Sequence, residues 1–217
     1  MWRFRAALEH ILDAVIPLRA RSARTKSRTL EDIPLIPTAH DLLGERITTL
    51  MDYRENAVQD LIHALKYDGS VHAAKLAADV LAEYLQEEIA SLRLFSQKKV
   101  LIVPVPLHKS RARERGFNQI EIVLRALPQE FRDGTVATLA SHALARSVAT
   151  KPQTQLPRSE RIKNIDAAFE VSDPPVFANT QVFLIDDVAT TGATLLNAGK
   201  PLRACGVEVT LLALARA

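Results

Sequence analysis

Residues 182–194 read VFLIDDVATTGAT, and the expected architecture rests on the two halves of this stretch. The apolar half predicts a strand from Gln181 to Asp186, because an unbroken apolar run is typical of a parallel strand covered on both faces. The second half is small and rich in hydroxyls, and it predicts a loop that opens a helix from Thr194 to Ala204. Asp186 and Asp187 therefore stand at the carboxyl end of a strand, where ligands bind in open α/β sheets.

Further strands and helices are expected on both sides of this stretch. Apolar runs predict one buried strand from Lys99 to Val105 and another from Val207 to Ala215. Strands that alternate with helices predict an α/β fold with a mostly parallel sheet and covering helices. The remaining expected elements are helices at 2–16, 55–66, 71–91 and 118–127, strands at 46–53 and 139–146, and an edge strand or loop after Pro34 and Pro37.

The composition is that of an ordinary globular protein. The chain has 217 residues, 47% of them hydrophobic and 24% charged, which suits one main core and excludes disordered and collagen-like classes. Its 28 lysines and arginines against 25 aspartates and glutamates give a net charge of +3, which allows anionic partners without requiring them. The single cysteine, Cys205, cannot form an intramolecular disulfide or a paired-cysteine zinc site, and we expect it to be a buried thiol.

The amino-terminal part lacks the features of a membrane or export signal. Charged side chains interrupt its apolar positions, and nothing in the chain approaches the roughly 18 consecutive apolar residues of a membrane span. We therefore expect a cytoplasmic protein without membrane insertion. The segment from Arg19 to Arg28 has five basic residues and no acid, which predicts a solvated linker; a nucleic-acid contact is the alternative.

The loop after the acid pair has the chemistry of a phosphate site. Thr190, Thr191 and Thr194 offer hydroxyl donors, Gly192 lets the backbone approach a ligand, and the first N–H groups of a helix bind anions. Carboxylates would repel a phosphate, so the acids are expected to face neutral hydroxyls or a metal ion. A sugar phosphate meets both demands, whereas the alternative is an ordinary turn in which a threonine or aspartate caps the helix.

This stretch resembles the phosphoribosyl-pyrophosphate motif of type I phosphoribosyltransferases. In that superfamily the acid pair binds the ribose hydroxyls and the loop binds the 5-phosphate. Ala189 departs slightly, because a bulkier aliphatic residue is usual there. The resemblance implies that the ligand is bound by Asp186, Asp187, Val188, Ala189, Thr190, Thr191, Gly192, Ala193 and Thr194.

Two further blocks resemble the ComF family, which includes competence protein ComFC and GntX-like proteins. They are the PVPLH block at 104–108, preceded by Val103, and the RGFNQ block at 115–119. The resemblance runs from about Tyr53 to the end of the chain. Other positions that match the family are Tyr53, Ile62, Leu65, Lys66, Tyr67, Gln153, Leu156, Arg161, Asn164 and Phe169.

The resemblance also implies which other residues contact the ligand. The catalytic set would be Asp186, Asp187 and Arg115, and residues 146–161 would form a flexible closing loop with contacts from Gln153, Arg158 and Arg161. The alternatives are a solvated face for Lys109, Arg111 and Arg113, and helix capping for Asn118 and Gln119. The implied pyrophosphate loop comprises Pro106, Leu107, His108, Arg111, Arg115, Asn118 and Gln119.

The implied fold is that of type I phosphoribosyltransferases, a mostly parallel twisted sheet with helices on both faces and a small amino-terminal helix and hood. We expect residues 1–52 to form that helix, the basic linker and the hood-like segment, and residues 53–217 to form the phosphoribosyltransferase-type domain. The family's usual amino-terminal zinc ribbon is not expected, because residues 18–21 read LRAR where its first cysteine pair would stand.

The expected function is binding of phosphoribosyl pyrophosphate with Mg²⁺, the metal being held through the ligand rather than by side chains, in a protein linked to DNA uptake. If it is catalytic, it would transfer the phosphoribosyl group to an acceptor that the sequence does not identify. One alternative is a non-catalytic accessory protein that binds single-stranded DNA or competence proteins, and another is a nucleobase-salvage enzyme. A homodimer is a further expectation.

Overall fold

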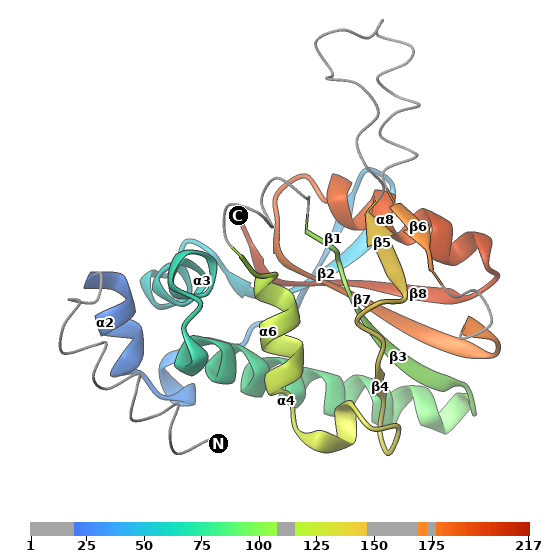
Figure 1. Cartoon of the computed structure of the whole chain (residues 1–217), viewed down its shortest axis with the longest axis horizontal. Coiled ribbons are helices and arrows are strands. Elements are labelled where there is room, and N and C mark those ends of the chain that lie inside the picture. Colours follow the sequence, from blue (N-terminus) through green and yellow to red (C-terminus); the bar gives the residue numbers. More distant parts are fainter. Residues whose placement is uncertain (1–19, 108–115, 147–168, 173–176) are drawn as a thin grey trace, which may run out of the picture.

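The computed structural model describes residues 20–107, 116–146, 169–172 and 177–217. Its centre is a six-stranded sheet in the order β1-β2-β8-β7-β3-β4 (Figure 1). All neighbouring strands in this sheet are parallel except β1 and β2, which form an antiparallel pair at one edge. The strands are β1 (Thr38–Leu42), β2 (Glu45–Asp52), β3 (Lys99–Pro104), β4 (Thr138–Leu139), β7 (Thr180–Ala189) and β8 (Glu208–Arg216).

Helices cover both faces of the sheet. On one face lie α3 (Asn56–Asp68), α4 (Val71–Phe95) and α6 (Gln119–Ala126), and on the other lie α8 (Ala193–Ala204) and a two-stranded sheet of β5 (Leu144–Arg146) and β6 (Phe169–Val171). Strand β7 shows why its apolar run is unbroken: Phe183 and Ile185 pack on the first face, and Val182 and Leu184 on the second. The predicted α/β class, with a mostly parallel sheet covered on both faces, is confirmed.

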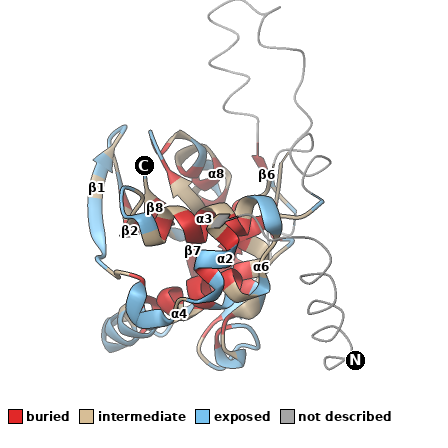
Figure 2. Cartoon of the chain, turned by 90° about the vertical axis from the view of Figure 1, so that its left-hand side faces the viewer, coloured by how far each residue is buried: buried red, intermediate tan, exposed pale blue. Residues whose placement is uncertain are grey.

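Local sequence explains where the main helices end and the sheet edge begins. Helix α3 stops at Gly69, whose φ of 56° is a left-handed conformation that glycine adopts without a steric penalty. Pro34 and Pro37 precede β1, which is an exposed edge strand as expected (Figure 2). Strand β2, which lies in the predicted 1–52 segment, pairs with β8 in the main sheet.

The order in which strands are added to the sheet switches sides between β3 and β7: β4 follows on one side of this pair and β8 on the other. After β3 the chain passes through α6 on one face to β4, whereas after β7 it passes through α8 on the other face to β8. Two neighbouring parallel strands whose connections diverge in this way leave a crevice at their carboxyl ends, and ligands bind in such crevices. The edge formed by the ends of β3 and β7 is therefore the place where this fold positions a site.

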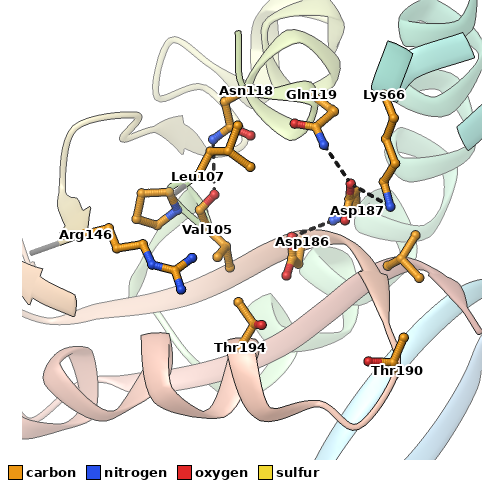
Figure 3. A pocket seen from close by; sticks show the side chains of 12 residues that line it. Lys66, Val105, Leu107, Asn118, Gln119, Arg146, Asp186, Asp187, Thr190 and Thr194 are labelled. Carbon is orange, nitrogen blue, oxygen red and sulfur yellow. Dashed lines mark hydrogen bonds and ion pairs between the residues drawn. The ribbon is translucent and has the colours of Figure 1, made fainter. Parts of the chain in front are cut away.

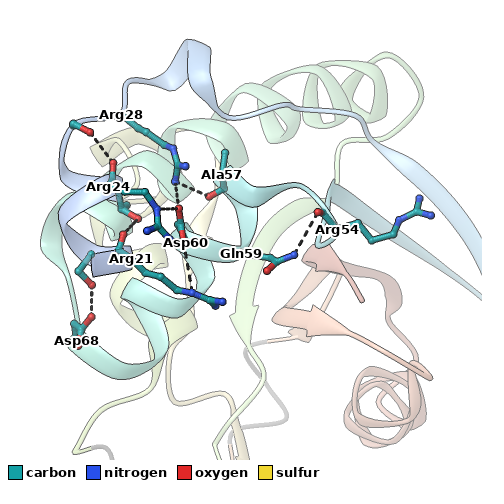
Figure 4. A network of polar contacts seen from close by, with 11 residues as sticks. Arg21, Arg24, Arg28, Arg54, Ala57, Gln59, Asp60 and Asp68 are labelled. Carbon is teal, nitrogen blue, oxygen red and sulfur yellow. Dashed lines mark hydrogen bonds and ion pairs between the residues drawn. The ribbon is translucent and has the colours of Figure 1, made fainter. Parts of the chain in front are cut away.

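The basic segment after Arg19 is not a solvated linker. Residues Ala20–Lys26 form helix α2, which docks on α3 (Figure 4). The carboxylate of Asp60, whose side chain is 4% exposed, accepts two hydrogen bonds from Arg24 at 2.7 and 2.8 Å and forms an ion pair with Arg28 at 3.0 Å. Arg21 adds a longer contact of 3.8 Å to the same carboxylate. These arginines neutralise a buried acid, which is why the segment folds.

Two smaller expectations are also corrected. The strand expected at 139–146 is two short strands, because the chain leaves the main sheet after β4 and crosses polar residues 141–142 before it enters β5. Cys205 is exposed rather than buried, since it follows the last turn of α8 at the molecular surface. Two 3₁₀ helices, η1 (Leu30–Asp32) and η2 (Gln129–Phe131), complete the described elements.

Two other expectations concern an amino-terminal helix and the lack of a membrane span. The helix expected at 2–16 lies outside the described residues. Among the helices that the structure describes, none is both long and apolar enough to cross a membrane.

Candidate functional site

A cavity of about 570 Å³ opens at the carboxyl ends of β3 and β7, where the connections of these two strands diverge to opposite faces of the sheet (Figure 3). Side chains reach it from both faces of the sheet, since α3 and α6 contribute from one face and α8 and β5 from the other. Most of the residues around it are polar or charged. The lining residues are Lys66, Val105, Pro106, Leu107, Asn118, Gln119, Arg146, Asp186, Asp187, Val188, Thr190 and Thr194.

Asp187 is held in place by two donors from the helices on one face. The ammonium of Lys66 on α3 lies 3.2 Å from Oδ2 of Asp187, and the amide nitrogen of Gln119 on α6 donates to the same oxygen at 3.1 Å. Asp187 is therefore fixed in orientation by a cation and an amide donor.

Asp186, its neighbour on β7, is in a different environment. Its Oδ1 accepts a hydrogen bond from the Asp187 backbone N–H at 2.9 Å. Desolvation at the base of the cavity, together with the negative charge of Asp187, raises the pKa of Asp186 to about 7, against weaker opposing effects of that hydrogen bond, Lys66 and Arg146. Asp186 can therefore hold a proton near neutral pH.

The loop after the acids is fixed by close packing and by an arginine. Gly192 has a φ of +78°, and a Cβ added there would lie 2.5 Å from Cδ1 of Ile47, so only glycine fits between the loop and β2. The guanidinium of Arg216 donates to the carbonyl oxygens of Ala189, at 3.0 Å, and of Thr190. Strand β8 thereby anchors the loop that begins α8.

The three threonines of this loop have different roles. Thr190 and Thr194 line the cavity, as expected of hydroxyl donors to a ligand. Thr191 instead accepts a long hydrogen bond of 3.4 Å from the Ala193 N–H at the start of α8. The N-cap residue of α8 is Gly192, so none of the three threonines caps this helix, whereas Thr190 and Thr194 present their side chains to the cavity.

Four of the residues implied to form the pyrophosphate loop line the same cavity: Pro106, Leu107, Asn118 and Gln119. Asn118 occupies the position before α6, but its side chain makes no capping hydrogen bond and donates to the Val105 carbonyl at 3.1 Å. Helix capping does not describe Gln119 either, because its amide donates to Asp187. His108, Lys109, Arg111, Arg113 and Arg115 lie outside the described residues.

Arg146 and Lys66 are cavity residues that were not predicted as site residues. Arg146 ends β5, where it lies over the ring of Phe169 with its Cζ 5.0 Å from the ring centroid, and it lines the cavity. Lys66 matched the family pattern, yet its role required knowing that α3 ends beside β7. The expected loop contacts Gln153, Arg158 and Arg161 lie outside the described residues, as does most of 146–161. Among the residues that the structure describes, no three His, Cys, Asp or Glu side chains group as metal ligands.

Comparison with known proteins identifies relatives of the chain. Competence protein F of Haemophilus influenzae is 35% identical over 118 residues, which are 54% of this chain and 50% of that protein. Competence protein ComFC of Streptococcus pneumoniae is 30% identical over 152 residues, which are 70% of this chain and 60% of that protein. DNA utilization protein YhgH of Escherichia coli is 31% identical over 153 residues, which are 70% of this chain and 63% of that protein.

The matched part of the chain thus spans between half and two thirds of the length of these relatives. No family model matches the chain. The similarity to competence and DNA utilization proteins covers most of the chain in the longer matches. The chain belongs to the ComF family.

Proposed function

We propose that this protein binds phosphoribosyl pyrophosphate together with Mg²⁺ in the cavity between β3 and β7, as a phosphoribosyltransferase-like member of its family. The observation that carries the proposal is the meeting of an acid pair, a threonine-lined helix start and two cations around one cavity. Its volume of about 570 Å³ lies in the range of small-molecule sites, roughly 300–1,000 Å³.

The cavity separates the two chemistries that a sugar phosphate requires. Thr190, Thr194 and the amino-terminal end of α8 suit the 5-phosphate, because hydroxyls and helix N–H groups favour anions. Asp186 and Asp187 suit the ribose hydroxyls, because a hydroxyl can donate a hydrogen bond to a carboxylate and accept one from a protonated acid. Arg146 supplies a guanidinium for the more negative pyrophosphate end.

The donor set around the cavity fits a magnesium ion that arrives with the ligand. Lys66 and Gln119 occupy one oxygen of Asp187, and the Asp187 amide occupies one oxygen of Asp186, so neither acid offers a complete bidentate site. Mg²⁺ is usually bound through substrate phosphates with few protein ligands. When bound, it would neutralise charge on the pyrophosphate as that group leaves.

A transferase reaction would use the residues around the ribose. Loss of pyrophosphate from C1 would leave positive charge on the ring, and the carboxylate of Asp187, held by Lys66 and Gln119, would favour that charge without having to reorient. A nitrogen nucleophile would then attack C1. Turnover with a free nucleobase would identify a salvage enzyme, whereas binding without turnover would point to a regulatory ligand.

Calorimetric titration tests the proposal. Phosphoribosyl pyrophosphate with Mg²⁺ is titrated into the full chain, with ribose 5-phosphate and pyrophosphate as comparison ligands. We expect the intact molecule to bind at least tenfold more tightly than either part, because only the intact molecule reaches both ends of the cavity. Absence of binding at millimolar ligand would refute the proposal.

We further propose that the protein acts in DNA uptake, since its relatives are named as competence and DNA utilization proteins. Binding of single-stranded DNA by the basic helix α2 is the second candidate function. Arg21 and Arg24 are 43% and 54% exposed, so their outer surfaces face solvent although both contact Asp60.

Fluorescence anisotropy with a labelled single-stranded oligonucleotide tests the DNA candidate. Affinity should fall steeply between about 50 and 200 mM salt, and Arg21→Gln should reduce the slope of log K against log salt by about one. Lys75→Gln, on the exposed side of α4, is the matched control. Salt-insensitive binding, or an equal effect of both substitutions, would contradict this candidate.

A further inference from the structure

The two acids at the cavity have unequal sets of partners. On Asp187, the donors Lys66 and Gln119 converge on one oxygen, at 3.2 and 3.1 Å. Within the described part of the chain, Asp186 accepts one hydrogen bond, from the backbone N–H of its neighbour at 2.9 Å. Lys66 is 22% exposed and Gln119 only 3%, so solvent screens these contacts weakly.

The hydrogen bond from Gln119 to Asp187 leaves the other end of the Gln119 amide without a partner among the residues that the structure describes. Its amide nitrogen points to Asp187 in Figure 3, and within the described part of the chain its buried Oε1 has no hydrogen-bond donor. The reverse orientation of the amide would place Oε1 against the carboxylate, which repels it. A buried acceptor without a partner is unfavourable, so the orientation that leaves it is explained by the demand of an ionised Asp187 for a donor.

We infer that Lys66 and Gln119 are positioning residues that make the adjacent acids unequal: they hold Asp187 as a hydrogen-bond acceptor and leave Asp186 to carry the proton. The pair then recognises two neighbouring ligand hydroxyls, one donating to Asp187 and the other accepting from Asp186. This inference rests on the proposed function and assigns the acid pair to the diol of the ligand.

The surroundings of Asp186 favour its protonated form on balance. Desolvation at the base of the cavity is the main effect that disfavours ionisation of Asp186, and the charge of Asp187 on β7 adds to it. Lys66 on α3 and Arg146 on β5 oppose this more weakly, and the cavity-lining residues of α6 and α8, Gln119 and Thr194, are neutral. Two adjacent carboxylates do not ionise equally when only one of them is paired with a cation. The cation and the amide donor both lie on Asp187, so the proton goes to Asp186.

Binding measurements on two matched variants test the inference. At pH 8, Asp186→Asn should bind phosphoribosyl pyrophosphate with Mg²⁺ at least as tightly as the unmodified protein, because the Asn amide donates a hydrogen bond as a protonated acid does. Asp187→Asn should lose about 10- to 100-fold in affinity, since it removes a charged acceptor. Equal losses in the two variants would overturn the inference.

The pH profile separates a positioning role from a merely structural one. Above pH 7 the affinity of the unmodified protein should fall about tenfold per pH unit relative to Asp186→Asn, with net proton uptake measured in buffers of different ionisation enthalpy. The Asp186→Asn profile serves as the reference for ionisation of the ligand itself. Lys66→Met should weaken binding about tenfold or more, whereas Lys75→Met on α4 should not.

Carboxyl ¹³C titration of the ligand-free protein tests the unequal acid pair separately from the proposed ligand binding. One aspartate should titrate near pH 7, and its signal should be absent in Asp186→Asn and present in Asp187→Asn. If the titration shows this split but no ligand binds, the proposed function and the diol assignment fail while the positioning by Lys66 and Gln119 stands. If the ligand binds but no such aspartate exists, the inference alone fails.

Discussion

Substitution of Asp60 by asparagine should release helix α2 from α3. Arg28, whose side chain is 18% exposed, would lose one charge-assisted contact worth about 1.5–3 kcal/mol. The two hydrogen bonds of Arg24 add less, because its side chain is 54% exposed and water competes for it. We therefore expect Asp60→Asn to lower the free energy of unfolding by about 3 kcal/mol, or Tm by about 6–12 °C for a chain of this size.

The effect should depend on pH in a definite direction. The hydrogen bond from Arg24 is the main cause that holds the pKa of Asp60 below its ordinary value, so the folded state favours the ionised form. This stabilisation is complete above the ordinary range of an aspartate and is lost as the pH falls through the lower pKa of the folded state. The difference in free energy of unfolding between the unmodified protein and Asp60→Asn should have its full size at pH 7 and should disappear in strong acid.

Urea denaturation followed by circular dichroism, at pH 7 and in strong acid, measures both quantities. Asp79→Asn is the matched control, since Asp79 pairs with Lys75 on the exposed side of α4 and should cost less than about 1 kcal/mol. Hydrogen exchange should show faster exchange of the α2 amides in Asp60→Asn. A loss below 1 kcal/mol at pH 7, or a gap that does not change with pH, would refute the assignment of the arginine cluster to a structural role.

Three further substitutions test the site loop and the acid pair. Gly192→Ala should destabilise more than Gly206→Ala, because both glycines have a φ of +78° but only at Gly192 does the added Cβ meet Ile47; equal thermal shifts would contradict the packing account. Arg216→Met should weaken ligand binding about tenfold by freeing the carbonyls of the loop, and an unchanged calorimetric titration would count against that anchor. Asp186→Asn should raise the free energy of unfolding at pH 8 by at most about 4 kcal/mol, since the folded state pays to ionise an acid with a pKa of about 7, and the gain should shrink to nothing as the pH falls to about 4. A gain that grows in acid would reverse the sign and refute this reading of Asp186.

The sequence was sufficient to predict the sheet because its central strands are buried on both faces. Residues 182–185 and 100–104 are apolar without alternation, and the structure places them in β7 and β3 at the middle of the sheet. The acid pair at the end of β7 could be placed at a ligand edge for the same reason.

Contacts between distant residues could not be predicted in the same way. Arg24 and Asp60 are 36 residues apart, so a basic run without its acid partner read as a solvated linker. Lys66 reaches Asp187 only because α3 packs beside the end of β7, a result of strand order rather than of local pattern. Arg146 stood at the start of an expected loop, and its place in the cavity follows from the pairing of β5 with β6.

A second cavity with basic side chains is another place where an anion could bind. It measures about 620 Å³, lies at the opposite end of the sheet where β3 and β4 begin, and is lined by Arg93, Lys98 and Lys99 among others. It carries positive charge but has no acid pair and no helix start with threonines among its lining residues. A phosphate attracted only by charge would prefer this cavity.

Amide chemical-shift mapping during titration with phosphoribosyl pyrophosphate and Mg²⁺ distinguishes the two cavities in one experiment. We predict saturable shifts at residues 186–194 and at Lys66, Gln119 and Arg146, with little change at Lys98 and Lys99. Shifts confined to the second cavity, or no saturable shifts at either cavity, would contradict the claim that the cavity at the carboxyl ends of β3 and β7 is a sugar-phosphate site.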